Sequence, residues 1–142
     1  MDIRVRFPGG KRVDAELGGK TVATDQSEDH GGTGVAPEPF ELFLAALATC
    51  AGFYVLGFCR TRGIPTEGLE LIQRQRFDEG THRLAGVDIE IVLPPGFPEK
   101  YRASVVQAAL GCKVKKTLMD PPEIAVFASG GAPLQSADLR RS

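Results

Sequence analysis

Alternation of apolar and polar residues at the start of the chain predicts short β-strands. Residues 2–7 alternate in this way, and a second alternating stretch runs over about residues 11–24. Glycine pairs interrupt the pattern at Gly9-Gly10 and at Gly18-Gly19. Because glycine adopts the backbone angles of tight turns at little cost, these runs are typical of antiparallel strands joined by turns.

Three further stretches have the composition of strands. Residues 69–77 and 84–93 alternate in the same way, and a turn at Asp78-Glu79-Gly80 separates them. A last strand is predicted over residues 124–128.

The longest apolar segment predicts a helix from about Pro39 to Arg62, with apolar residues on nearly every side. A helix of this kind is normally buried at the centre of a fold. It ends at Gly63, a residue that commonly follows helices. A second helix is predicted from Pro98 to about Leu110, and a shorter one from about Cys112 to Met119.

The order of strands, helix, strands, helix and strand predicts an α+β protein, with antiparallel sheets around a long buried central helix. We expect one domain over residues 1–129 and a flexible C-terminal tail over residues 130–142. Residues 25–37 are polar and rich in glycine, which predicts a flexible loop before the central helix.

Composition narrows the functional classes. The chain has 142 residues, of which 42% are hydrophobic and 25% charged, and its formal net charge is -1. This balance is typical of a globular domain and leaves no excess of positive charge for nucleic acid or anionic lipid. The N-terminus has no secretory pattern, and the longest apolar run is shorter than the roughly 20 residues that span a bilayer. We therefore expect a cytoplasmic protein without nucleic-acid or membrane partners.

Three cysteines carry the candidate chemistry, and their odd number fits poorly with a secreted disulfide framework. Cys112 follows Gly111 and precedes several lysines, so a helix N-terminus and positive charge both favour its thiolate. Cys50 lies in apolar sequence, where burial raises the pKa of a thiol. The contrast suggests a redox pair, although packing roles explain both positions as well. Cys59 falls on the opposite helix face from Cys50 and is interpreted as packing.

The sequence offers little that would bind a metal or a phosphate. No two cysteines have the close spacing of a zinc site, and His30 and His82 lie in predicted loops. The glycine-rich stretch 31–34 lacks the residues that complete a phosphate-binding loop. We therefore expect neither a metal nor a cofactor.

The two cysteine segments form a pair that occurs together in one known group of proteins. The first is PFELFLAALATC at residues 39–50, with its helix continuing to Ile64, and the second is AALGCKVKKTL at residues 108–118, followed by Pro121-Pro122. In this order they resemble the OsmC/Ohr superfamily of thiol-dependent hydroperoxide reductases. The resemblance covers roughly residues 1–129. It implies an intertwined homodimer in which the central helices pack together and each active site draws on both chains.

The resemblance also implies a mechanism. Cys50 would attack the O–O bond of an organic hydroperoxide and become a sulfenic acid, Cys112 would resolve it as a disulfide, and an external dithiol would reduce that disulfide. In characterised members an arginine from the N-terminal strands supplies positive charge beside the attacking thiol. Arg12 is the candidate, with Arg4 and Arg6 behind it, although a surface position at a turn explains Arg12 equally well.

Two residues depart from the family pattern. Peroxidatic members carry a glutamate directly after the proline at the helix start, where this chain has Phe40, and the nearest carboxylates are Glu38 and Glu41. Phe40 cannot hold a guanidinium as a carboxylate does. The segment resembles a less characterised branch of the superfamily. Lys113 is the second departure, because many members have proline after the resolving cysteine.

These departures leave more than one function open. The leading hypothesis is thiol-dependent reduction of organic hydroperoxides by Cys50 and Cys112. The alternative is a non-enzymatic module on the same scaffold, which binds a small apolar or thiol-bearing ligand in a cleft near Phe40, Phe43 and Phe53. A purely structural role would require both cysteines to be inert to oxidant.

Overall fold

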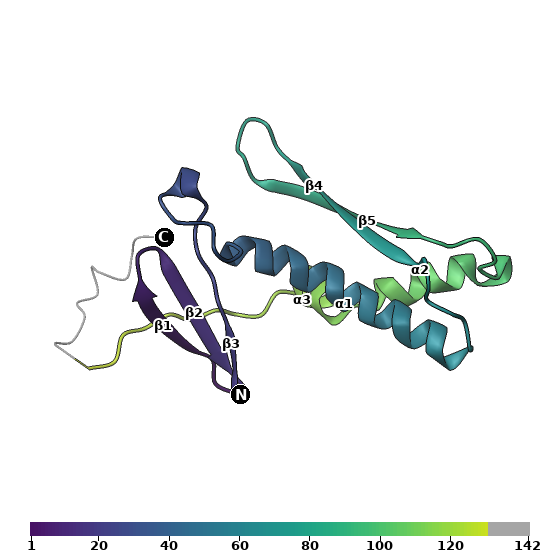
Figure 1. Cartoon of the computed structure of the whole chain (residues 1–142), viewed down its shortest axis with the longest axis horizontal. Coiled ribbons are helices and arrows are strands. Elements are labelled where there is room, and N and C mark those ends of the chain that lie inside the picture. Colours follow the sequence, from purple (N-terminus) through teal and green to yellow (C-terminus); the bar gives the residue numbers. More distant parts are fainter. Residues whose placement is uncertain (131–142) are drawn as a thin grey trace.

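Figure 1 presents the computed structural model of the protein, which describes residues 1–130. The predicted flexible tail at 130–142 lies outside these residues, apart from Gly130. Along the described chain the elements follow one another as β1 (Arg4–Gly9), β2 (Arg12–Leu17), β3 (Lys20–Val22), η1 (Glu28–His30), α1 (Pro39–Thr61), β4 (Glu70–Phe77), β5 (Leu84–Val92), η2 (Glu99–Tyr101), α2 (Arg102–Leu110) and α3 (Lys113–Met119).

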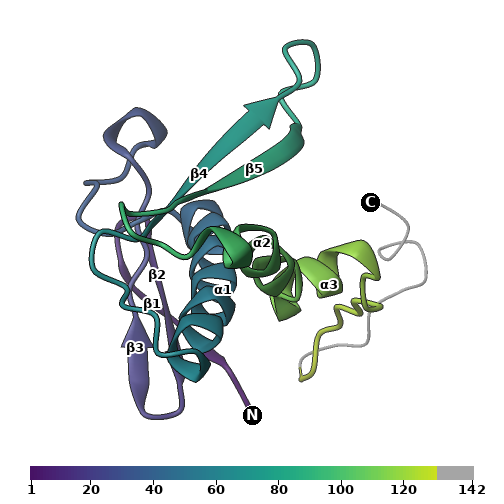
Figure 2. The same cartoon turned by 90° about the vertical axis from the view of Figure 1, so that its right-hand side faces the viewer.

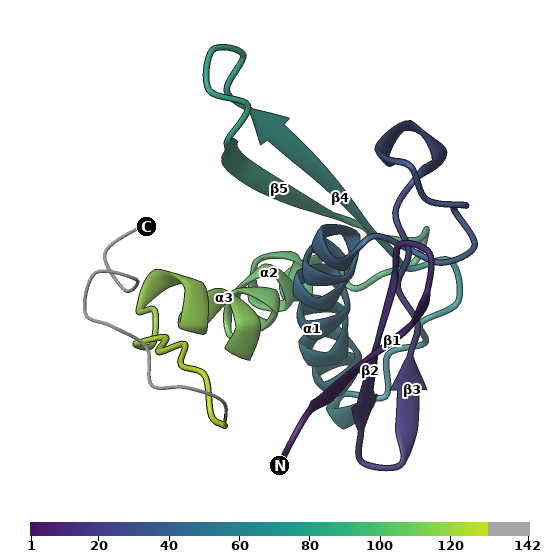
Figure 3. The same ribbon diagram turned by 90° about the vertical axis from the view of Figure 1, so that its left-hand side faces the viewer.

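Both sheets are antiparallel, and the α+β class is confirmed. In the first sheet β2 lies between β1 and β3, and Ala15 pairs with Val5 on one side and Val22 on the other. The second sheet is the hairpin β4–β5, in which Leu71 lies opposite Ile91. The hairpin lies over α1 and α2, while the β1–β3 sheet stands off the N-terminal end of α1 (Figures 1 and 3).

The strand predicted over residues 124–128 is wrong. These residues form no strand, and Ile124 and Phe127 are 82% and 83% exposed. A strand needs a neighbouring strand to satisfy its backbone groups, whereas alternation alone supplies none. The segment runs well away from both sheets of the same chain (Figures 2 and 3).

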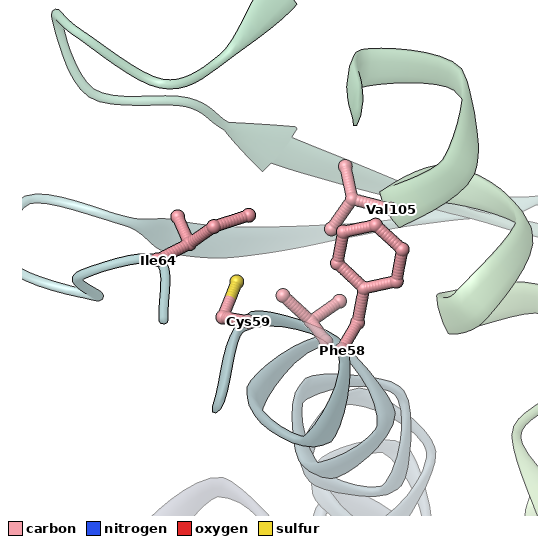
Figure 4. Packing of buried hydrophobic residues seen from close by; sticks show 5 residues of the cluster. Phe58, Cys59, Ile64 and Val105 are labelled. Carbon is pink, nitrogen blue, oxygen red and sulfur yellow. The ribbon is translucent and has the colours of Figure 1, made fainter. Parts of the chain in front are cut away.

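A stripe of side chains on α1 builds the core. The stripe recurs at the three- and four-residue spacing of one helix face, and its buried members are Leu47, Ala51, Val55, Phe58 and Cys59. Near the end of α1, Phe58 and Cys59 pack with Ile64 and with Val105 of α2 (Figure 4). Further towards the start of the helix, Leu47 and Ala51 pack around Cys112.

One side of α1 is open in the single chain, where Phe53 is 71% exposed. Phe40 and Tyr54 are also exposed in part. By length and composition alone, α1 is a helix that could cross a membrane. We predicted that the central helix is buried on nearly all sides. Within one chain it is buried on one side only.

The loop between β3 and α1 is held by a buried carboxylate. Asp25 is 1% exposed and accepts hydrogen bonds from the backbone N–H groups of Gln26, Thr33 and Val35, and from the Thr33 hydroxyl. At Gly32 a side chain would collide with the Gln26 carbonyl, which a Cβ would approach to 1.9 Å. The loop predicted to be flexible is thus closed around a specific hydrogen-bond network.

Replacement of Asp25 by Asn tests this network. The hydrogen bond from the Thr33 side chain, together with the backbone donors, lowers the pKa of Asp25 to about 2. A folded-state pKa below the unfolded one means that the charged carboxylate stabilises the fold above about pH 4, and this contribution disappears as the pH falls towards 2. We expect wild type to be more stable than D25N at pH 7, with a gap that narrows as the pH falls from 4 to 2. Urea unfolding across this range measures it, and a pH-independent gap would contradict it.

Candidate functional site: two thiols between α1 and α3

The turn from α2 into α3 presses against α1. At Gly111, a Cβ would lie 3.1 Å from the Ala108 carbonyl oxygen and 3.4 Å from the Tyr54 ring of α1, so a residue without a side chain suits this position. The next residue, Cys112, is the N-cap of α3. The close approach at Gly111 therefore places Cys112 directly on the middle of α1.

Cys112 is almost fully buried, with 1% of its surface exposed. Its Sγ accepts a hydrogen bond from the Lys115 backbone N–H at 3.5 Å, which is the bond of an N-cap residue. The same Sγ lies 3.9 Å from the Leu47 carbonyl oxygen of α1, to which the thiol donates. One thiol thus joins the start of α3 to α1.

Cys50 lies beside this contact and is half-buried. The backbone N–H groups of Val114 and Lys113 and the Cys112 thiol lie close enough to its sulfur to lower the pKa of the Cys50 thiol. All cysteines in the described residues are free thiols. The structure therefore brings together the two cysteines that the sequence nominated, although 62 positions separate Cys50 from Cys112 in the chain.

The two thiols have opposite pKa shifts. The Val114 backbone N–H is the largest cause that lowers the pKa of Cys50, and the Cys112 thiol, the Lys113 N–H and the Lys113 charge lower it further. Burial raises the pKa of Cys112. The local sequence favoured a thiolate at Cys112, whereas the family resemblance made Cys50 the attacking residue. In the structure the residues at the start of α3 lower the pKa of Cys50.

The third cysteine, Cys59, belongs to the core between α1 and α2. It is fully buried, and desolvation raises the pKa of its thiol. The interpretation of Cys59 as a packing residue is confirmed. Residues 1–130 also contain no cluster of three or more His, Cys, Asp or Glu side chains suited to a metal ion.

Arg12 lies in β2 and is held by a neighbouring carboxylate. Its Nη2 is 2.7 Å from Oδ2 of Asp14, and its buried Nε has no hydrogen-bond partner in the described part of the chain. Arg6 pairs with Glu16 at 3.6 Å. Arg12 is not among the groups that shift the pKa of Cys50, where the cation is Lys113. The role predicted for Arg12 beside Cys50 stays a prediction.

The carboxylates near Phe40 serve the start of α1. Glu38 is the N-cap and forms a capping box with Glu41, while its Oε1 lies 2.9 Å from Nδ1 of His30. The hydrogen bond with His30 is the main cause that lowers the pKa of Glu38 to about 2. Phe40 instead stacks on Phe43, with ring centroids 5.5 Å apart. The spacing of two glutamates around Pro39 could have revealed this cap from the sequence.

A cavity of about 420 Å³ opens beside Cys112, between β5 and the three helices, and Cys50 is not part of its lining. Its walls are mainly apolar, and Cys112 is among the residues that line it. Arg102 and Lys115 are its charged members. Phe40, Phe43 and Phe53, which we expected around an apolar cleft, are not part of its lining.

The site consists of two neighbouring thiols on an α+β scaffold. The pKa of one thiol is lowered and the pKa of the other is raised, and these features place the protein among those that carry a pair of neighbouring thiols. Residues 30–127 match the family model described as OsmC-like protein. This match spans most of the chain, and the chain belongs to the OsmC-like family, as the cysteine segments indicated. No functionally curated protein matches it in sequence.

Solved structures share this fold. A proposed osmotic-stress-induced and detoxification-response protein from Psychrobacter arcticus 273-4 has 25% identity and a TM-score of 0.69, covering 81% of this chain and 85% of that one. A hypothetical protein from Aquifex aeolicus VF5 has 14% identity and a TM-score of 0.66, with coverages of 84% and 87%. An organic hydroperoxide resistance protein from Legionella pneumophila has 17% identity and a TM-score of 0.52, with coverages of 83% and 89%.

Replacement of Val114 by proline tests the main cause of the Cys50 pKa shift. Proline has no N–H, and a first-turn position tolerates it because its N–H has no partner within the helix. We expect V114P to raise the pKa of the Cys50 thiol and to slow its alkylation by iodoacetamide at pH 7 by up to about tenfold. V114A keeps the N–H and should react as wild type does. Equal slowing in both variants would contradict the assignment.

Proposed function

We propose that the protein reduces organic hydroperoxides by a two-cysteine cycle. The observation that carries the proposal is the contact between Cys50 and Cys112, in which the pKa of the half-buried thiol is lowered and that of the buried thiol is raised. A thiolate is the nucleophile in such reactions, so Cys50 is the attacking residue. Cys112, which packs in the same cluster as Cys50, is the resolving residue.

The cycle balances in three steps. The Cys50 thiolate attacks the outer oxygen of ROOH, the O–O bond breaks, and the alkoxide takes a proton from solvent to leave as ROH while Cys50 becomes a sulfenic acid. The Cys112 sulfur then attacks the Cys50 sulfur, and the sulfenic oxygen leaves with two protons as water. An external dithiol transfers two electrons and two protons to the disulfide, restoring both thiols and becoming a disulfide itself.

Burial of the second thiol suits the resolving step. Since burial raises the pKa of Cys112, its sulfur remains mainly protonated at neutral pH. A protonated thiol competes poorly for hydroperoxide, so attack falls to Cys50. The apolar cavity beside Cys112 favours a hydroperoxide with an apolar body. This chemistry needs a dithiol-supplied, reducing compartment, and we propose the cytoplasm.

We also propose that the protein is a homodimer. The open side of α1 carries the exposed aromatic side chain of Phe53, and exposed apolar surface of this kind marks an interaction site. Packing of this face against a second copy would complete the burial that the apolar sequence of α1 predicts. In such a dimer Arg12 would reach the Cys50 site of the other chain.

A ligand-binding module without catalysis is the second candidate, and the apolar cavity of about 420 Å³ is the observation that favours it. Binding to the folded state raises the unfolding temperature without needing a reactive thiol. Stabilisation of C50S by an apolar carboxylic acid such as decanoate, with no hydroperoxide consumed by wild type, would support this candidate over the two-cysteine cycle.

A stoichiometric dose of cumene hydroperoxide tests the cycle. We expect wild type to lose two thiols per chain and to form a Cys50–Cys112 disulfide, detected by intact mass and peptide mapping. C112S should stop at a sulfenic acid on Cys50 that dimedone traps, because the resolving thiol is missing. C59S is the matched control and should behave as wild type. Survival of both thiols in wild type, or unchanged hydroperoxide consumption in C50S, would overturn the proposal.

Replacement of Phe53 by glutamate tests the dimer. A charge in the middle of an apolar interface has no partner, so we expect F53E to weaken self-association by at least about tenfold. Sedimentation equilibrium measures the association constant. F77E is a matched control, since Phe77 is also exposed but lies at the end of β4, next to the hairpin turn. A wild-type monomer, or equal weakening by both variants, would contradict the dimer.

A further inference from the structure

A second cavity lies at the C-terminal end of α1, away from the thiols. It has a volume of about 390 Å³ and is formed by the segment that follows α1 and the segment between β5 and α2. Within residues 1–130 it shares no lining residue with the cavity beside Cys112. Arg62, which lines it, follows Cys50 by 12 positions, and this separation is about 18 Å along a helix. The cavity at the end of α1 is therefore separate from the thiol site.

A tight turn forms one wall of this cavity. The Phe97 backbone N–H donates to the Pro94 carbonyl oxygen at 3.1 Å, and Gly96 has a φ of 86°. A positive φ at the third residue marks a type II turn, which favours proline in second place, here Pro95, and glycine in third. The loop after α1 packs closely on this turn, because a Cβ at Gly68 would lie 3.3 Å from the Pro94 side chain. The two loops therefore hold each other in place.

Arg62 supplies a guanidinium group whose position is fixed. Its Cζ lies 3.8 Å from the centroid of the Phe58 ring, which is only 9% exposed, and its Nη1 donates to the Phe58 carbonyl oxygen at 3.2 Å. A guanidinium has five N–H donors, and within residues 1–130 this side chain makes no other hydrogen bond. The remaining donors can bind an anion through two parallel hydrogen bonds.

A second cation lines the same cavity. Nζ of Lys100 lies 4.9 Å from the centroid of the Tyr101 ring, and Cζ of Arg62 lies 5.6 Å from the same centroid. Neither cation forms an ion pair with a carboxylate of residues 1–130. Glu99, next to Lys100, is paired with Arg102 at 3.1 Å. Two positive charges are thus held around one ring without a counter-ion from the described part of the chain.

The rest of the lining is apolar apart from one carboxylate, Glu67. Glu67 forms no ion pair with either cation, so the lining keeps an excess of positive charge. Phe97 and several prolines supply the apolar surface. Apolar walls with a few converging polar groups are typical of sites for small molecules.

We propose that this cavity binds a small molecule that carries a phosphate or carboxylate group on an apolar body. The anionic group lies between Arg62 and Lys100, and the apolar body rests on Phe97 and the prolines. Glu67 disfavours a second negative charge elsewhere on the ligand, because like charges repel. The site goes beyond the proposed hydroperoxide reduction and does not depend on it, since it uses neither thiol.

An NMR titration of the ¹⁵N-labelled, reduced protein with phenyl phosphate and with benzoate tests the site and distinguishes the two anionic groups. We expect saturable binding of at least one of them, with amide shifts in the two loops that form the cavity. Benzyl alcohol has a similar ring and no charge, and it should bind at least about tenfold more weakly because it forms no charge-assisted hydrogen bond. If neither anion binds more tightly than benzyl alcohol, the proposal is wrong.

Four variants locate the anion. R62Q and K100Q should each weaken binding of the tighter anion by at least about threefold, and E67Q should strengthen it by removing a like charge. R60Q is the matched control, since Arg60 is exposed at the same end of α1 but does not line the cavity. K100Q removes no hydrogen bond or ion pair within residues 1–130, so it tests the site even if R62Q fails to fold. Unchanged binding in K100Q, or equal weakening by R60Q, would overturn the proposal.

Discussion

The packing of the first turn of α3 against the middle of α1 is the constraint on which the thiol site depends. Gly111 allows the α2–α3 turn to approach Tyr54, and Cys112 then caps α3 while touching the Leu47 carbonyl. The backbone N–H groups at the start of α3 consequently lower the pKa of the Cys50 thiol on α1. This one tertiary contact thereby determines how deeply both thiols are buried, which groups surround them and how readily each loses its proton.

Burial and hydrogen bonding act in opposite directions on these two neighbouring sulfurs. Both thiols lose solvent, which disfavours the charged form, but only Cys50 gains enough donors to reverse that effect. The donors are backbone groups that α3 cannot use internally, so they are available for a thiolate without disturbing the helix. A pair of chemically identical side chains is in this way divided into a more acidic and a less acidic member.

Much of the fold could be predicted from the sequence, because alternation, glycine turns and one long apolar helix are local signals. The strand predicted at residues 124–128 failed, since a strand also needs a partner edge that local sequence does not supply. The pairing of Cys50 with Cys112 followed from the family resemblance. The direction of their pKa shifts could not be predicted, because it depends on where the Val114 N–H points after α3 docks on α1.

The central claim is that Cys50, and not Cys112, is the more acidic thiol of the pair. A pH titration of the cysteine ¹³Cβ chemical shifts in the reduced, selectively labelled protein would measure all three thiols separately. We predict that the pKa of Cys50 lies below the ordinary value of a cysteine, and that the pKa values of Cys112 and Cys59 lie above it. A titration in which Cys112 loses its proton before Cys50 would contradict the account.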